Sequence, residues 1–147
     1  MVTFRLFGRL YSIKGSEKLK SDIEKTKIEM RIIEDSKFII LKGRNKQFYF
    51  DMKARNGEKV LRSEDHETNC NCRKAIAFVR ENSPYDNRYA RRLAPNKQHY
   101  FILTKANGQA LGISVMYDTV ISREEGITMV KRDALTAEIK DHSHDSI

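Results

Sequence analysis

The alternation of apolar and polar residues along this chain predicts a series of short β-strands. Phe48, Phe50 and Met52 are separated by polar residues, which is the period of a strand with one buried face. The same pattern or short apolar runs predict further strands at 37–42, 60–63, 89–93 and 111–115. Asn56-Gly57 and Asn107-Gly108 follow strands directly and predict two-residue hairpin turns, because both residue types tolerate positive φ.

Two segments instead show the spacing of a helix with one apolar stripe. Four apolar residues recur at i, i+3, i+4 and i+7 after Thr68, which offers its side-chain oxygen as an N-cap; they are Cys72, Ala75, Ile76 and Val79. A less regular stripe follows Thr119 and includes Val120, Arg123, Ile127 and Val130. Each helix is expected to pack its stripe against a sheet.

The chain contains an internal duplication. Shifted by 51 residues, Asn45-Lys46-Gln47-x-Tyr49-Phe50 lies over Asn96-Lys97-Gln98-x-Tyr100-Phe101, and the matches continue through both turns and both helices. This match predicts two tandem βββα repeats, residues 37–84 and 85–135. An internal repeat of this kind determines the whole fold assignment. The expected fold class is α+β, with one antiparallel sheet shared by both repeats and the helices on one face.

The two ends of the chain lie outside the repeats. In residues 1–36, Val2, Phe4, Leu6 and Leu10 alternate as a strand, a helix can begin at Ser16, and residues 28–32 alternate again. This pattern predicts a β-α-β unit that precedes the repeats. Residues 136–147 show no periodicity and are expected to form a flexible tail.

The second repeat resembles the repeat of the YegP-like family of small bacterial domains. The similar residues are Lys105-Ala106-Asn107-Gly108, Ser114, Met116-Tyr117, Gly126-Ile127 and Val130-Lys131. The first repeat departs from this pattern, with His66 in place of the Tyr and Ala75 in place of the Gly. The resemblance implies antiparallel strands with helices on one face, and it implies no catalytic residues. It does not cover the N-terminal unit.

Composition and charge restrict the class of protein. The 147 residues include 28 Lys and Arg against 20 Asp and Glu, giving a net charge of +8. No apolar run approaches the length of a membrane span, and the N-terminus lacks the apolar block of a signal peptide. Two cysteines do not make a disulfide framework. These features predict a basic cytoplasmic protein without a membrane role. The resemblance to a family of bacterial domains implies a bacterial or phage origin.

Candidate chemistry is sparse. His66, Cys70 and Cys72 have soft-ligand spacing, but a structural zinc site needs a fourth ligand, and no second cysteine pair exists. His66 and His99 could serve as acid and base only if the fold brought them together. No phosphate-binding loop or nucleophile motif occurs. We therefore expect no catalytic residues, no metal, no cofactor and no enzymatic activity.

The cations are the most informative functional feature. Residues 37–84 carry 11 Lys and Arg against 6 Asp and Glu. Cations beside an aromatic side chain on a sheet suit phosphate contact with base stacking. The candidate binding residues are Arg5, Arg9, Tyr11, Lys42, Arg44, Lys46, Tyr49, Lys53, Arg55, Arg91 and Arg92. Arg5, Arg9 and Tyr11 are expected on one side of the first strand, and Lys53 and Arg55 on the face that carries Tyr49.

Two functions remain open at this point. The first is a non-catalytic binder of RNA or of a ribonucleoprotein, such as a phage- or mobile-element-encoded inhibitor of an RNA-guided nuclease, an anti-CRISPR-like role. The alternative is a YegP-like protein-interaction module, a monomer or a homodimer, with no nucleic-acid role. In that alternative, an open sheet edge, the strand Phe38 to Leu41 or the pair Tyr49 and Tyr100 would carry the contact. The null explanation is that the cations confer solubility and protect edge strands.

Overall fold

The computed structural model describes residues 3–6, 9–12 and 35–144, and the chain divides into two compact units, residues 1–34 and 35–147. In the first unit, β1 (Thr3–Leu6) pairs with β2 (Arg9–Ser12) in an antiparallel hairpin. The expected single strand through Leu10 is therefore wrong, and Gly8, a residue that favours chain reversal, was the signal against it. The helix expected after Ser16 and the strand expected at 28–32 lie outside the described residues.

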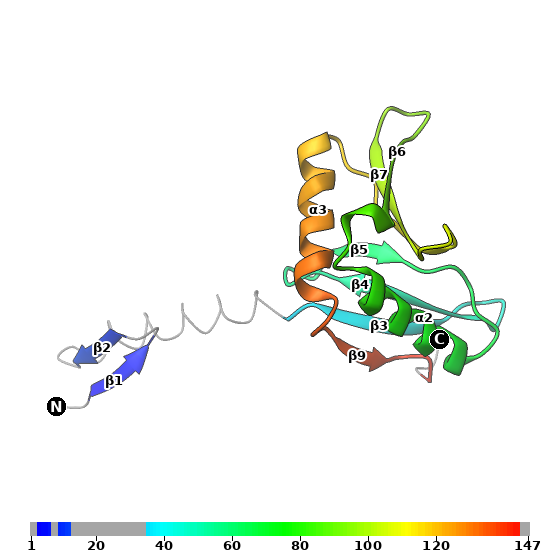
Figure 1. The fold of residues 1–147 in the computed structure, drawn as a ribbon. Coiled ribbons are helices and arrows are strands. Elements are labelled where there is room, and N and C mark those ends of the chain that lie inside the picture. Colours follow the sequence, from blue (N-terminus) through cyan, green and yellow to red (C-terminus); the bar gives the residue numbers. More distant parts are fainter. Residues whose placement is uncertain (1–2, 7–8, 13–34, 145–147) are drawn as a thin grey trace. The chain divides into compact units, whose positions relative to one another are not determined.

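The second unit contains the predicted tandem repeats as one α+β fold (Figure 1). The first repeat consists of β3 (Lys37–Lys42), β4 (Phe48–Lys53), β5 (Lys59–Arg62) and α2 (Asn69–Asn82). A short 3-10 turn, η1 (Asp86–Arg88), leads into the second repeat. That repeat consists of β6 (Tyr89–Leu93), β7 (His99–Thr104), β8 (Ala110–Ser114) and α3 (Val120–Asp133), and β9 (Glu138–Asp141) follows it.

Both repeats contribute to one seven-stranded sheet, in the order β6-β7-β8-β5-β4-β3-β9. The repeats join where β5 pairs with β8, with Leu61 opposite Ser114 and Arg62 opposite Ile113. The expected shared sheet is thus confirmed, and every pairing is antiparallel except that of β3 with β9. The expected flexible tail is wrong for its first part. β9 extends β3 in parallel, and His142 N donates to Ile40 O, because tertiary pairing orders a segment that has little local pattern.

The hairpin turns of the two repeats share one backbone geometry, which differs from the turn type that the sequence predicted. At the Asn56-Gly57 turn, Gly57 N donates to Ala54 O, and Gly57 alone of the two takes a positive φ, of 83°. The loop is therefore a type I turn closed by a left-handed residue, not the expected two-residue turn. The Asn56 side chain accepts from Glu58 N and holds the turn. The turns after β3 and β6 repeat this bonding with Lys46 and Lys97 at positive φ.

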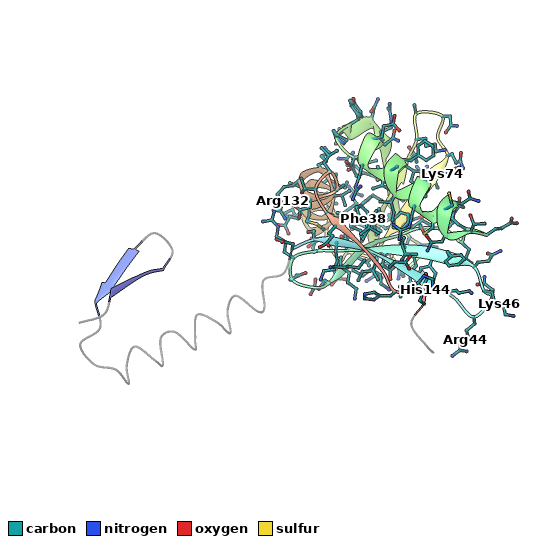
Figure 2. The ribbon with its side chains drawn as sticks, turned by 90° about the horizontal axis from the view of Figure 1, so that it is seen from below. Phe38, Arg44, Lys46, Lys74, Arg132 and His144 are labelled. Atoms are coloured by element: carbon teal, nitrogen blue, oxygen red, sulfur yellow. The ribbon has the colours of Figure 1, made fainter. Side chains whose placement is uncertain are left out.

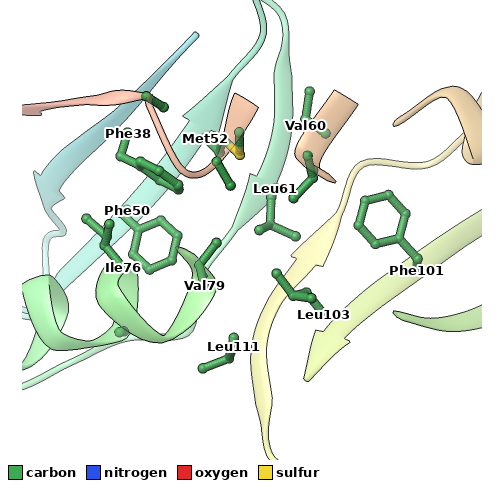
Figure 3. Packing of buried hydrophobic residues seen from close by; sticks show 14 of the residues in the cluster. Phe38, Phe50, Met52, Val60, Leu61, Ile76, Val79, Phe101, Leu103 and Leu111 are labelled. Atoms are coloured by element: carbon green, nitrogen blue, oxygen red, sulfur yellow. The ribbon is translucent and has the colours of Figure 1, made fainter. Parts of the chain in front are cut away.

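The helices cover one face of the sheet and share a single hydrophobic core with it (Figure 3). Thr68 and Thr119 accept from the backbone N–H three residues later, so both predicted N-caps are confirmed. The predicted stripe of α2 is buried, and α3 buries Ile127 and Val130. The core repeats its own geometry. Phe38 meets Phe50 edge to face at 5.7 Å, and the equivalent Tyr89 and Phe101 also lie 5.7 Å apart.

Candidate functional site

The turn between β3 and β4 presents three of the predicted cations together. Lys42, Arg44 and Lys46 are exposed, and none forms a salt bridge within residues 35–144. Arg44 and Lys46 project from the tip of this turn (Figure 2). The Lys42 ammonium lies 5.4 Å from the centre of the Phe48 ring. This turn therefore presents three predicted cations that have no salt bridge within residues 35–144 and are available to an anionic ligand.

Arg55 does not lie where the sequence placed it. Lys53 shares with Tyr49 the face of β4 opposite the helices, because residues two apart in a strand share a face. Arg55 follows the end of β4 and pairs with Asp133 at the end of α3, at 3.0 Å. The prediction that Lys53 and Arg55 project together is therefore wrong. Arg55 serves to tie the first repeat to the helix of the second.

Tyr49 is already covered by a cation of its own sheet. The Arg62 guanidinium lies 4.7 Å from the centre of the Tyr49 ring. It also donates to both carboxylate oxygens of Asp51, at 2.7 and 2.9 Å, and this raises the pKa of Arg62. Asp51 is almost fully buried, and Lys59 lies 3.7 Å from it. A base that stacks on this face of the Tyr49 ring would have to displace Arg62. Arg62 is not among the binding residues that the sequence predicts.

Arg91 and Arg92 on β6 have different surroundings. Arg91 donates to Glu124 on α3 and to Asp86 in η1, at 2.9 Å each. Arg91 and Lys131 hold the pKa of Asp86 at about 2, below its ordinary value. Arg92 is exposed and forms no salt bridge within the described part of the chain. Only Arg92 of this pair is thus a free cation in the region that the structure describes.

The N-terminal candidates are divided between two strands. Arg5 lies on β1 opposite Leu10, and Arg9 lies on β2 opposite Leu6. Tyr11 lies on β2 opposite Phe4. The expected stripe along one side of a single strand is therefore wrong. The side chains of these three residues lie outside what the structure describes.

The face of the sheet away from the helices, here called the open face, carries aromatic, aliphatic and charged residues. Ile102, Ile113 and Arg62 are paired in register across β7, β8 and β5, and Ile113 is 48% exposed. Tyr49 and Tyr100 occupy equivalent half-buried positions on β4 and β7. Arg92 lies opposite Tyr100 and therefore faces the same way. Ile102 and Ile113 form a small apolar pair beside Arg62, which is not a large apolar patch.

The first strands of the two repeats differ in a way that the duplication makes clear. Strand β3 begins the first repeat, and β9 covers its outer side. Strand β6 is the equivalent strand of the second repeat, and among the described strands it pairs only with β7. Ile40 is fully buried beneath its neighbours, whereas the equivalent residue is the half-exposed Arg91. We call the unpaired side of Tyr89–Leu93 the β6 edge.

Exposed apolar residues lie near the β6 edge. Leu93 is 61% exposed at the end of the strand. The salt bridge of Arg91 to Glu124 places the first turns of α3 beside β6, and that part of the helix exposes Val120 and Ile121. Val120, Ile121 and Glu124, with further residues of α3, line a shallow cavity of about 440 Å³ along that helix. By contrast, the strand Phe38 to Leu41 cannot serve as an interface as the alternative supposed, because Phe38, Ile39 and Ile40 are buried.

The histidines and cysteines form no combined site. His66 pairs with Phe48 and His99 with Tyr117, one in each repeat. Cys72 is buried in the core, and burial raises its pKa to about 11, whereas Cys70 is exposed. In the described residues, no three His, Cys, Asp or Glu side chains are grouped to hold a metal ion. Nor does a described helix have the length and apolar character needed to cross a membrane.

Comparison with known proteins places both repeats. A domain of unknown function, DUF1508, matches residues 44–89 and 94–141, so the second match includes β9. The UPF0339 protein YegP of Escherichia coli K12 is 42% identical over 106 residues, 72% of this chain and 96% of that protein. A UPF0339 protein of Bordetella pertussis is 39% identical over 108 residues, 74% of this chain and 97% of that protein.

Two solved structures have the same fold. The solution structure of the E. coli protein of unknown function yegP matches with a TM-score of 0.72 at 40% identity. That match covers 78% of this chain and 99% of the other. A UPF0339 protein of Shewanella oneidensis matches with a TM-score of 0.71 at 37% identity, over 76% of this chain and 94% of the other. Both the family and the E. coli protein are described as being of unknown function.

Proposed function

This chain belongs to the DUF1508 family, and we propose that it is a non-catalytic protein-interaction module that binds a partner protein at the β6 edge. One observation carries the proposal: β6 has a single strand neighbour among the described strands, whereas the equivalent β3 has two. An unpaired edge offers a row of backbone N–H and C=O groups to another chain. Exposed Leu93, Val120 and Ile121 lie close to this edge and supply apolar contact area.

A second copy of this chain is disfavoured as the partner. If two β6 strands paired antiparallel about their central residue, Arg91 would oppose Arg91 and Arg92 would oppose Ala90. The two Arg91 guanidinium groups, each already paired with Glu124 and Asp86, would then have to approach each other. The two Arg92 groups, which have no salt bridge within the described residues, would lie diagonally across the same short interface. Like charges close together across two strands destabilise their pairing. We therefore expect a monomer by light scattering, and a partner of different sequence and opposite charge.

The proposal is tested by recovering partners from bacterial lysate with and without RNase. Arg92→Glu reverses an exposed charge on β6 that has no salt bridge within the described residues, so it is expected to preserve the fold. Arg44→Glu makes the same change of charge at the turn between β3 and β4 and is the matched control. We expect an RNase-resistant protein partner that is lost with Arg92→Glu and kept with Arg44→Glu. Equal recovery by both variants would refute binding at the β6 edge.

RNA binding is the second candidate, and the turn of Lys42, Arg44 and Lys46 favours it. These exposed cations have no acidic partner within the described residues and are available to phosphates. The same two variants distinguish RNA from a protein partner. For RNA binding, Arg44→Glu is the test variant and Arg92→Glu is its control. RNA-dependent recovery that falls steeply with salt, and that Arg44→Glu abolishes while Arg92→Glu does not, would support RNA as the ligand.

A further inference from the structure

The internal duplication shows what kind of segment an edge of this sheet accepts. On β3, the added strand β9 runs parallel, with Phe38 opposite Ile139 and Ile39 opposite Lys140. Ile139 packs against the hydrophobic core on the helix side. The next residue on that side, Asp141, accepts from Asn69 and Arg73 of α2, at 2.9 Å each. β9 is therefore a complete example of strand addition within the same molecule.

The equivalent positions at the β6 edge have different chemistry on the helix side. Asn69 and Arg73, which hold Asp141, correspond to Val120 and Glu124 of α3. Val120 is 47% exposed and cannot donate a side-chain hydrogen bond to a carboxylate, and Glu124 would repel it. Arg91, the strand residue opposite this position, is already paired with Glu124 and Asp86. A strand added here is therefore expected to carry an apolar residue where β9 has Asp141. Val120 and the neighbouring Ile121 would cover that residue.

The open-face side of the β6 edge favours acidic residues. Ile39 and Leu41 of β3 face this side, and the corresponding residues of β6 are Ala90 and Arg92. Arg92 is exposed without a salt bridge in the described part of the chain, so an added carboxylate gains a partner without breaking an existing pair. Cross-strand neighbours of opposite charge stabilise strand pairing. Charge selects the partner here, and the backbone pairing supplies most of the contact.

We propose that the β6 edge binds an extended segment of a partner protein as a parallel eighth strand, with apolar residues toward α3 alternating with acidic residues toward Arg92. This inference rests on the proposed function and specifies the chemistry of the partner. The segment resembles β9 in its direction and alternation, and differs from it where the two edges differ. Apolar side chains meet Leu93, Val120 and Ile121, and carboxylates meet Arg92.

A peptide derived from β9 provides the probe. The test peptide is residues 137–143 with Lys140→Glu, Asp141→Val and His142→Glu, and the control peptide has Lys at every acidic position of the test peptide. Amide chemical shifts of the full-length protein are followed by NMR while each peptide is added. We expect the test peptide to shift amides of β6 and the start of α3, and to bind at least about ten-fold more tightly than the control peptide. In Arg92→Glu this preference should reverse, and in Arg44→Glu it should remain.

The outcomes are separable from those of the proposed function. Shifts elsewhere on the protein, or equal affinity for both peptides, would overturn the inference. If the lysate partner is lost with Arg92→Glu while the test peptide does not bind, the β6 edge is an interaction site but does not bind by parallel strand addition. If neither the peptide nor a lysate partner depends on Arg92, both proposals fail.

Discussion

Replacing Gly126 with alanine tests whether the glycine is needed to make room for the Tyr117 ring. A Cβ at Gly126 would overlap the Tyr117 hydroxyl oxygen and would lie 2.8 Å from Cζ. Both contacts are shorter than real ones, so the ring of Tyr117 must move. In the first repeat the equivalent residues are Ala75 and His66, in which a shorter ring accompanies the methyl group. The effect of a substitution at position 126 on the free energy of unfolding therefore depends on the residue at position 117.

The magnitude follows from two opposing terms. Alanine in the middle of α3 is favoured over glycine by about 1 kcal/mol through helix propensity. Forcing the half-buried Tyr117 ring aside costs about 1–3 kcal/mol, the usual cost of overpacking. Gly126→Ala alone should therefore destabilise the protein by about 1 kcal/mol. In a Tyr117→His background the clash is absent, and the same substitution should stabilise by about 0.5–1 kcal/mol.

The assay is urea unfolding of the wild type, the two single variants and the double variant. The four free energies form a double-mutant cycle, and we expect a coupling of about 2 kcal/mol between positions 117 and 126. Ala75→Gly in the first repeat is the matched control, expected to destabilise by about 1 kcal/mol. A Gly126→Ala effect that is the same in both backgrounds would show that Tyr117 moves without cost and would refute the reasoning.

Three further predictions concern turns, acid stability and thiols. Lys46→Gly and Lys97→Gly should each raise the free energy of unfolding in urea by about 1 kcal/mol, because both lysines have positive φ; lower stability would instead show that the side chains contribute contacts. Hydrogen bonds from Arg132, and one from the Ser36 hydroxyl, hold the pKa of Asp133 at about 2 against an ordinary 3.8. A carboxylate with a lowered pKa stabilises the fold above its unfolded pKa, so stability should fall as the pH drops from about 4 to 2, and less steeply in Asp133→Asn. Iodoacetamide should label Cys70 in the folded protein and Cys72 only after unfolding, as mass spectrometry of peptides would show; rapid labelling of Cys72 in the native state would contradict its burial.

The elements of both repeats could be read from local pattern. The strands expected at 37–42 and 89–93 have those bounds in the structure, and both threonine N-caps and the α2 stripe are present. Each depends on residues within one or two turns of chain, where side-chain period and capping chemistry act directly. The duplication strengthened these predictions, because each repeat supports the reading of the other.

The interaction site was less accessible to this reasoning, since it depends on which residues the fold brings together. Arg55 meets Asp133 and Arg91 meets Glu124 across long stretches of sequence, so a count of cations overestimates the free positive surface. From the sequence, Arg91 and Arg92 are equivalent candidates, but within the described residues only Arg91 forms salt bridges. Arg62 was missed as the residue that covers Tyr49, because its stacking requires the register of β4 with β5.

The sequence alone therefore determined the repeats, their strands, helices and caps, because these follow from short-range periodicity. Tertiary structure decided that β9 pairs with β3, whereas among the described strands β6 pairs with β7 alone. Ile139 is a single apolar residue between charged neighbours, and this pattern is too short to predict a strand. Its partner strand β3 lies almost a hundred residues earlier in the sequence. Strand pairing between distant segments is a property of the assembled core. The uncovered edge that we propose as the binding site exists only after that core has formed.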